Sequence, residues 1–124
     1  MAAVKVLLVE DEGLIRLVTS EILQDEGFEV VEAWSGDEAA RLLDGPDSFD
    51  ILFTDGQMPG TLDGVEVAIY ARQRHPGIPV LVVSGYAAQL MSRLRGLDPS
   101  AVFIGKPYSL QEVTTVVRHL TTKL

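Results

Sequence analysis

The sequence predicts an α/β fold in which a doubly wound parallel sheet lies between two layers of helices. Its apolar runs of strand length are mostly continuous rather than alternating, which is typical of strands buried on both faces. A segment with helical periodicity follows each run, so that strand and helix alternate five times along 124 residues. Short connections of this kind imply right-handed crossovers. We therefore expect a (βα)5 arrangement that forms one domain over residues 1–124.

Five strands are expected at the five apolar runs. Four runs are continuous apart from Lys5, and these are residues 4–9, 51–53, 80–83 and 102–104. The remaining run, residues 28–33, alternates with glutamates and suits an edge strand with one face partly wet.

Five helices are expected after these strands. An apolar stripe marks the first helix, and Gly27 is a typical helix end. The second, third and fifth helices each begin with Ser or Asp followed three residues later by Glu, the spacing of a capping box. The fourth helix is expected over roughly residues 88–94. The stripe consists of Ile15, Val18, Ile22 and Leu23, and the caps are Ser35, Asp63 and Ser109.

The composition restricts the class of partner. The formal net charge is -8 and the ten basic residues are scattered, so direct nucleic-acid binding through a positive face is not expected. The absence of cysteine excludes disulfide and cysteine–zinc chemistry. There is no run of membrane-spanning length and no signal-peptide pattern, so we expect a cytoplasmic protein without a membrane partner.

The functional residues are expected where the apolar runs end. Asp11, Asp55 and Lys106 each close a run, and a doubly wound sheet binds its ligands at the carboxyl ends of its strands. Clustered carboxylates repel one another, and a hard divalent cation with oxygen ligands relieves that repulsion. Glu10 adds a further oxygen ligand, although Glu10 and Glu12 also suit the simpler role of helix caps. The spacing of a calcium loop is absent, so Mg²⁺ is favoured.

Lys106 and Ser84 complete this edge of the sheet. Lys106 ends a buried run and would either neutralise Asp55 or bind an incoming phosphoryl group. A cis bond to Pro107 would aim the lysine inward. Ser84 ends the fourth run and precedes Gly85, which is also a common turn signal.

The chain resembles a receiver domain of a two-component response regulator, similar to the single-domain chemotaxis regulators. The matching stretches, which cover essentially all of the chain in the family's order, are VLLVEDE, DILFTDGQMPG, PVLVVSGYA and FIGKP. The resemblance implies a flavodoxin-like fold with strand order 2-1-3-4-5. It also implies a signalling protein that catalyses only its own phosphorylation and dephosphorylation, rather than an enzyme.

The resemblance also implies roles for the site residues. Asp55 would be the phospho-acceptor, receiving its phosphoryl group from a histidine kinase or a histidine phosphotransfer protein. Lys106 would bind the phosphoryl group, and Ser84 and Phe103 would form the switch. The metal ligands of the cofactor Mg²⁺ would be Glu10, Asp11, Asp55 and the backbone carbonyl of Gln57.

An output surface is implied around the fourth helix, the fifth strand and the fifth helix, where an unknown downstream protein would bind. Its candidate residues are Leu90, Met91, Leu94 and Tyr108, although helix residues of this type are more often part of the core. The segment GQMPGTLDG carries one residue more than the family usually has, near Gly60 and Thr61, which predicts a reshaped loop beside the metal. Gln57 and Tyr86 occupy positions at which the family tunes its rate of dephosphorylation.

Two other functions share this fold or chemistry. A flavodoxin-like ligand-binding module would place a flavin phosphate at the same strand ends, but the acidic loop after Val9 would repel a phosphate that lacks a metal. An aspartyl-phosphate phosphohydrolase would need a substrate pocket, and the sequence has no loop long enough to build one.

Overall fold

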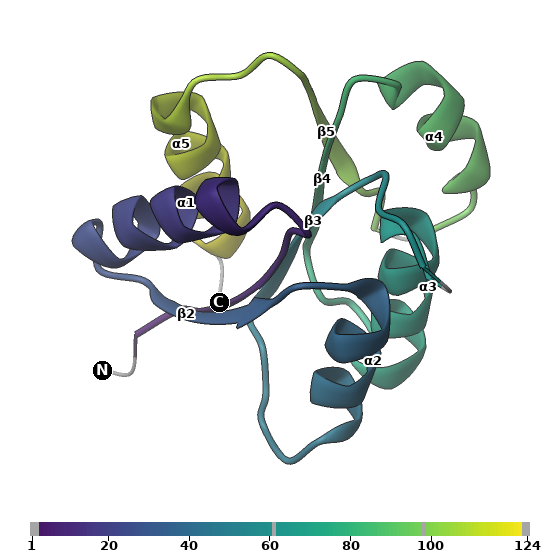
Figure 1. Ribbon diagram of the computed structural model, residues 1–124. Helices are drawn as coiled ribbons and strands as arrows, with labels where there is room; N and C mark the ends of the chain where they lie inside the picture. Colours follow the sequence, from purple (N-terminus) through teal and green to yellow (C-terminus); the bar gives the residue numbers. More distant parts are fainter. Residues whose placement is uncertain (1–2, 61, 98, 123–124) are drawn as a thin grey trace.

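A computed structural model of the chain describes residues 3–60, 62–97 and 99–122. Over these residues five strands alternate with five helices, as predicted (Figure 1). The strands are β1 (Lys5–Val9), β2 (Glu29–Ala33), β3 (Ile51–Asp55), β4 (Val80–Ser84) and β5 (Val102–Gly105). The helices are α1 (Gly13–Asp25), α2 (Gly36–Asp44), α3 (Gly64–Arg74), α4 (Ala87–Arg93) and α5 (Leu110–Thr121).

The strands form one parallel sheet in the order β2-β1-β3-β4-β5, which confirms the expected fold. β2 is an edge strand, as its alternating glutamates predicted. β1 and β3 are neighbours, and Val9 pairs with Thr54. The residues that follow this pair, Glu10 and Asp55, therefore leave the sheet side by side.

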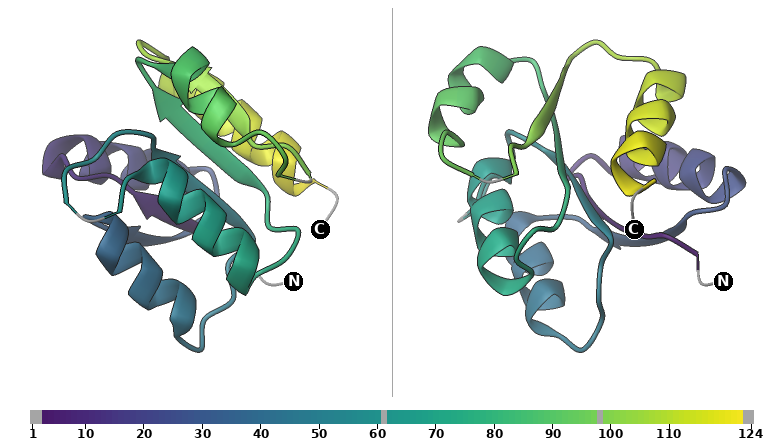
Figure 2. Two further views of the ribbon diagram at one scale, coloured as in Figure 1. Left: turned by 90° about the vertical axis from the view of Figure 1, so that its right-hand side faces the viewer. Right: turned by 180° about the vertical axis from the view of Figure 1, so that it is seen from behind.

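Helices cover both faces of the sheet, α1 and α5 on one face and α2, α3 and α4 on the other (Figures 1 and 2). Successive strand residues alternate between the two faces. Leu8 and Phe53 join the core below α1 and α5, whereas Leu7 and Leu52 join the core below α2, α3 and α4. This two-sided burial explains why the strand runs are continuously apolar. Among the described residues, no helix is long and apolar enough to span a membrane.

Helix α1 does not bury its most apolar face. Its buried residues are Thr19, Ser20 and Leu23, two of which are polar. The apolar stripe noted in the sequence is turned partly outward, and Ile15 and Val18 are 37% and 39% exposed. An outward apolar face on a helix beside the carboxyl ends of the strands is a feature that the core of the protein does not explain.

The connection from β3 to α3, which we call the β3–α3 loop (residues 56–63), is closed tightly at its base. The N–H of Gly64 donates to the carbonyl oxygen of Gly56 at 3.1 Å. A Cβ at position 64 would lie 1.9 Å from the carbonyl oxygen of Asp55, so only glycine fits there. Asp63 and Glu66 then form a complete capping box, as predicted. Thr61, near which the extra residue was placed, lies outside the described residues.

Candidate functional site

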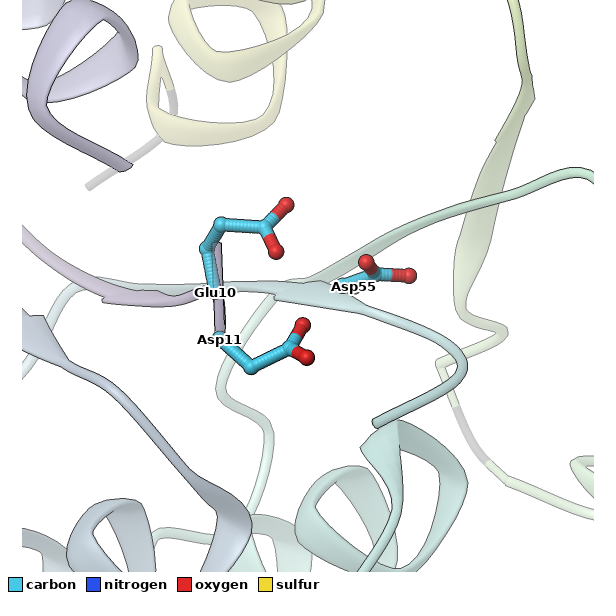
Figure 3. A group of neighbouring side chains, drawn as sticks. All are labelled: Glu10, Asp11 and Asp55. Atoms are coloured by element: carbon cyan, nitrogen blue, oxygen red, sulfur yellow. The ribbon is translucent and has the colours of Figure 1, made fainter. Parts of the chain in front are cut away.

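Three carboxylates converge at the carboxyl ends of β1 and β3. Each of Glu10, Asp11 and Asp55 offers an oxygen, and these atoms all lie within 4.8 Å of one another. Figure 3 shows the three side chains pointing into a common space from two neighbouring strands. Glu10 and Asp55 are buried, whereas Asp11 is exposed. The sequence prediction that these residues lie together is therefore met.

The electrostatics of this cluster fit a divalent cation. Burial, with a smaller contribution from the charge of Asp55, raises the pKa of the Glu10 carboxyl to about 7, although the hydrogen bond from the N–H of Glu12 acts in the opposite direction. That N–H donates to Glu10 Oε2 at 3.0 Å, so Glu10 also accepts a hydrogen bond from the residue that precedes α1. The available ligands are all oxygens, and three carboxylates around one space suit a hard cation such as Mg²⁺.

Lys106 reaches this cluster from the end of β5. Its Nζ donates to Asp55 Oδ2 at 3.0 Å, and the Lys106–Pro107 peptide bond is cis. Partial burial lowers the pKa of Lys106, but the hydrogen bond to Asp55 and the charges of Asp55 and Glu10 outweigh it, so the pKa is raised. The lysine therefore stays protonated at neutral pH and neutralises part of the carboxylate charge.

Both oxygens of Asp55 accept a hydrogen bond. Oδ2 faces Lys106, and Oδ1 accepts from the backbone N–H of Gln57 at 3.1 Å. The side chain of Gln57 is exposed, so its backbone is the part nearest to the cluster. Asp55 is thus held in one orientation at the end of β3, with Gln57 directly beside it.

Ser84 ends β4, the strand next to β3, and Phe103 lies on β5, the strand beyond it. Ser84 is 1% exposed, and its Oγ accepts from the backbone N–H of Tyr86 at 2.9 Å. Phe103 is partly buried and packs against the core on the α2, α3 and α4 face. Tyr86, in contrast, is 54% exposed.

Two of the four candidates for an output surface are core residues. Leu90 and Leu94 are 3% and 5% exposed and belong to the core on the α2, α3 and α4 face of the sheet. Met91 is 54% exposed and remains available for a partner. Tyr108 is partly buried on the opposite face, near α5. Of the two alternatives for these residues, the core role therefore holds for both leucines.

An apolar groove beside Lys106 was not predicted. It has a volume of about 690 Å³ and lies between α1 and the start of α5. The sequence signal was the stripe in α1, but periodicity alone does not show which side of a helix faces the sheet. The residues that line the groove are Leu14, Ile15, Val18, Thr19, Lys106, Pro107, Tyr108 and Leu110.

The chain matches a known protein family along most of its length. Residues 6–118 match the family model described as the response regulator receiver domain. The chain belongs to this family. The family is one of signalling modules that interact with histidine kinases and downstream effectors and generally bind Mg²⁺, rather than of enzymes in the usual sense.

Individual relatives agree with this assignment. The chain is 37% identical over 119 residues to the sensor kinase CckA of Brucella abortus, covering 95% of this chain and 12% of the kinase. It is 34% identical over 115 residues to the transcriptional regulatory protein CpxR of Escherichia coli, covering 92% of this chain and 47% of the regulator. The chain thus spans half or less of these relatives.

A solved structure gives the same result for the fold. The response regulator receiver protein from Sinorhizobium medicae superimposes with a TM-score of 0.88 at 32% identity, covering 97% of this chain and 95% of that one. The receiver fold predicted from the sequence is therefore confirmed along nearly the whole chain.

Proposed function

We propose that this receiver accepts a phosphoryl group on Asp55 and thereby changes the surface around α4, β5 and α5. The observation that supports this most directly is the position of Asp55, which lies within 4.8 Å of two other carboxylates and 3.0 Å from Lys106 Nζ. The negative charge of this cluster would repel the oxygens of an incoming phosphoryl group unless cations neutralise it. Lys106 would supply one positive charge and a bound metal the rest.

Asp55 acts as the nucleophile in the proposed transfer. One of its carboxylate oxygens forms a bond to phosphorus as the N–P bond of a phosphohistidine breaks. The electron pair of that bond remains on the histidine nitrogen, which then takes up a proton. Lys106, which holds Asp55 Oδ2 before the transfer, exchanges that partner for a phosphoryl oxygen.

The proposed metal ligands are Glu10, Asp11, Asp55 and the backbone carbonyl of Gln57. The N–H of Glu12 donates to the carboxylate of Glu10, and the N–H of Gln57 donates to that of Asp55, so both carboxylates are held in place. A bound Mg²⁺ supplies neutralisation of charge on the carboxylates and on the transferred group.

The proposed switch starts at Ser84. In the structure described, its hydroxyl oxygen accepts from Tyr86, and its own proton is free to be donated to a phosphoryl oxygen on the adjacent strand. A movement of Ser84 toward Asp55 would draw the start of α4 with it and open space for Phe103. Met91 and Tyr86, both exposed, would then report the change to a downstream protein.

The phosphodonor is proposed to dock in the apolar groove beside α1. This groove ends at Lys106, whose Nζ is bonded to the acceptor, so a protein seated there brings its histidine to Asp55. Leu14, which also lines the groove, is 74% exposed. The occupant is therefore an apolar helical surface next to the phosphohistidine of a histidine kinase or phosphotransfer protein.

The acceptor role is tested with the purified chain, Mg²⁺ and acetyl phosphate. Intact mass should rise by one phosphoryl group in the wild type and in Asp25→Asn, a control that alters an exposed aspartate at the end of α1. It should not rise in Asp55→Asn. An adduct that persists in Asp55→Asn, or a wild type that forms none with any donor, would contradict the proposal. Steady turnover of a phosphomonoester would instead favour a phosphohydrolase.

A further inference from the structure

The β3–α3 loop is held from both sides as well as at its base. On one side, a Cβ built on Gly36, the first residue of α2, would lie 2.2 Å from the carbonyl oxygen of Leu62. On the other side, α4 meets the loop at two points. Leu62 therefore lies against the start of α2, while Gly56 and Asp63 lie against α4.

The first contact with α4 is apolar. Leu90 is 3% exposed, and its Cδ1 would lie 2.3 Å from a Cβ added to Gly56. Leu90 thus occupies the space that a side chain at position 56 would need. Gly56 directly follows Asp55, so α4 packs on the backbone between the acceptor and Gln57.

The second contact is an ion pair. Arg93 Nη1 donates to Asp63 Oδ2 at 2.8 Å, while Asp63 Oδ1 accepts from the N–H of Glu66 and caps α3. Partial burial raises the pKa of Asp63, but the bonds from Arg93 and Glu66 outweigh it and lower the pKa. Arg93, Asp63 and Gln57 also line one hollow of about 420 Å³, together with Met58 and Pro59.

We propose that Arg93 is a positioning residue for the metal site, because its bond to Asp63 and the seat of Leu90 on Gly56 hold the β3–α3 loop with Gln57 beside Asp55. The inference rests on the proposed function, in which the Gln57 carbonyl binds Mg²⁺. The coupling is reciprocal. Bound metal stabilises the present position of α4 and weakens the binding of a partner that pulls α4 away, and that partner lowers the metal affinity by the same factor. Arg93 acts through the loop and touches no reacting atom.

The charge of Arg93 allows a sharp test. If Arg93 acted only through its electric field, its removal would strengthen the binding of a cation. If it positions the loop, its removal weakens binding. Mg²⁺ affinity is measured by isothermal titration calorimetry on the unphosphorylated chain. We expect Arg93→Ala to weaken binding by about two- to fivefold, the range that an exposed ion pair supports.

Matched variants separate position from charge. Arg95→Ala removes the same charge from an exposed residue just beyond α4 and should leave the affinity unchanged or slightly higher. Arg93→Lys should restore part of the loss. Asp63→Asn retains the cap oxygen but removes the ionic partner, and it should have little effect in the Arg93→Ala background if the two residues act as a pair.

A second readout is hydrogen exchange in α4. Mg²⁺ should slow the exchange of α4 amides in the wild type and should do so less in Arg93→Ala. An affinity that is unchanged or raised in Arg93→Ala, or additive effects of Arg93→Ala and Asp63→Asn, would overturn the inference while the proposed function stands. Failure of the wild type to bind Mg²⁺ would instead overturn the proposed function, and the inference with it.

Discussion

The two helices that flank the carboxylate site, α1 and α4, expose very different amounts of their apolar surface. Leu14 on α1 is 74% exposed, and its neighbours Ile15 and Val18 are each more than a third exposed. Leu90 lies within α4 and is 3% exposed, and Leu94, the residue that caps the end of α4, is 5% exposed. Helix α1 therefore offers an apolar surface at rest, whereas the leucines at α4 are covered and only Met91 among the three apolar candidates there is exposed.

This difference indicates how the proposed input and output are separated. A phosphodonor must bind before anything has changed, so its surface must be available in the resting protein, as the groove beside α1 is. An output partner must bind only afterwards, so most of its apolar contacts are better kept buried until α4 moves. Because Leu90 is seated on Gly56, the backbone next to the acceptor would control the opening of this surface in the proposed switch.

The largest effect is expected at Lys106, which the two regions share. It lines the groove and also bonds to Asp55, so Lys106→Ala removes a cation from the transfer step itself. We expect the rate of phosphorylation to fall about a hundredfold with acetyl phosphate and with a phosphohistidine protein alike. Lys106→Arg should recover part of the rate. A loss seen with the protein donor alone would assign Lys106 to docking rather than to chemistry.

A matched pair of leucines compares the two helices directly. Leu90→Ala removes a buried side chain and should lower the free energy of unfolding by about 2–4 kcal/mol. Leu14→Ala removes an exposed one and should change it by less than about 0.5 kcal/mol. Urea unfolding followed by circular dichroism measures both. Equal losses would mean that α1 is packed as tightly as α4, and the comparison would fail.

Much of the fold and the centre of the site could be predicted because their signals are local. A strand buried on both faces needs a continuous apolar run, and the residue that ends such a run must lie at the edge of the sheet. Asp55, the last residue of β3, and Lys106, which directly follows β5, are therefore identifiable from their positions. The cap at Asp63 was predictable for the same reason, since its partner Glu66 is three residues away.

The features that could not be predicted depend on contacts between distant segments. Nothing local shows that Thr19 and Ser20, rather than Ile15 and Val18, face the sheet, because that choice depends on how α1 lies on β1 and beside α5. The bond from Arg93 to Asp63 joins residues 30 positions apart. Small polar residues let a helix approach a sheet closely, and the sequence pattern alone gives them no preference for the interior.

A smaller effect is expected from the groove, and it should be specific to protein donors. Leu14→Ser should slow phosphoryl transfer from a phosphohistidine protein by about tenfold, the cost of one well-placed apolar contact, and leave acetyl phosphate unaffected. Leu17→Ser is the matched control, because Leu17 is 49% exposed on the same helix but does not line the groove. An equal loss in both variants would move the docking surface to the outer face of α1.

The smallest effect concerns the ion pair that holds α4, and its sign follows from the lowered pKa of Asp63. A carboxyl whose pKa is lower in the folded chain than the ordinary 3.8 stabilises the fold above that value, and the contribution is lost as the pH falls through the folded pKa. The charged groups that face Asp63 are Arg93 from α4 and Glu66 from α3.

At pH 7, Asp63→Asn should therefore be less stable than the wild type by no more than about 1 kcal/mol. Urea unfolding at a series of pH values should show this difference shrink as the pH falls below 3.8 and through the folded pKa of Asp63. A difference that does not shrink as the pH falls would mean that the charge of Asp63 does not stabilise the fold, and α4 would then be held by Leu90 without help from Arg93.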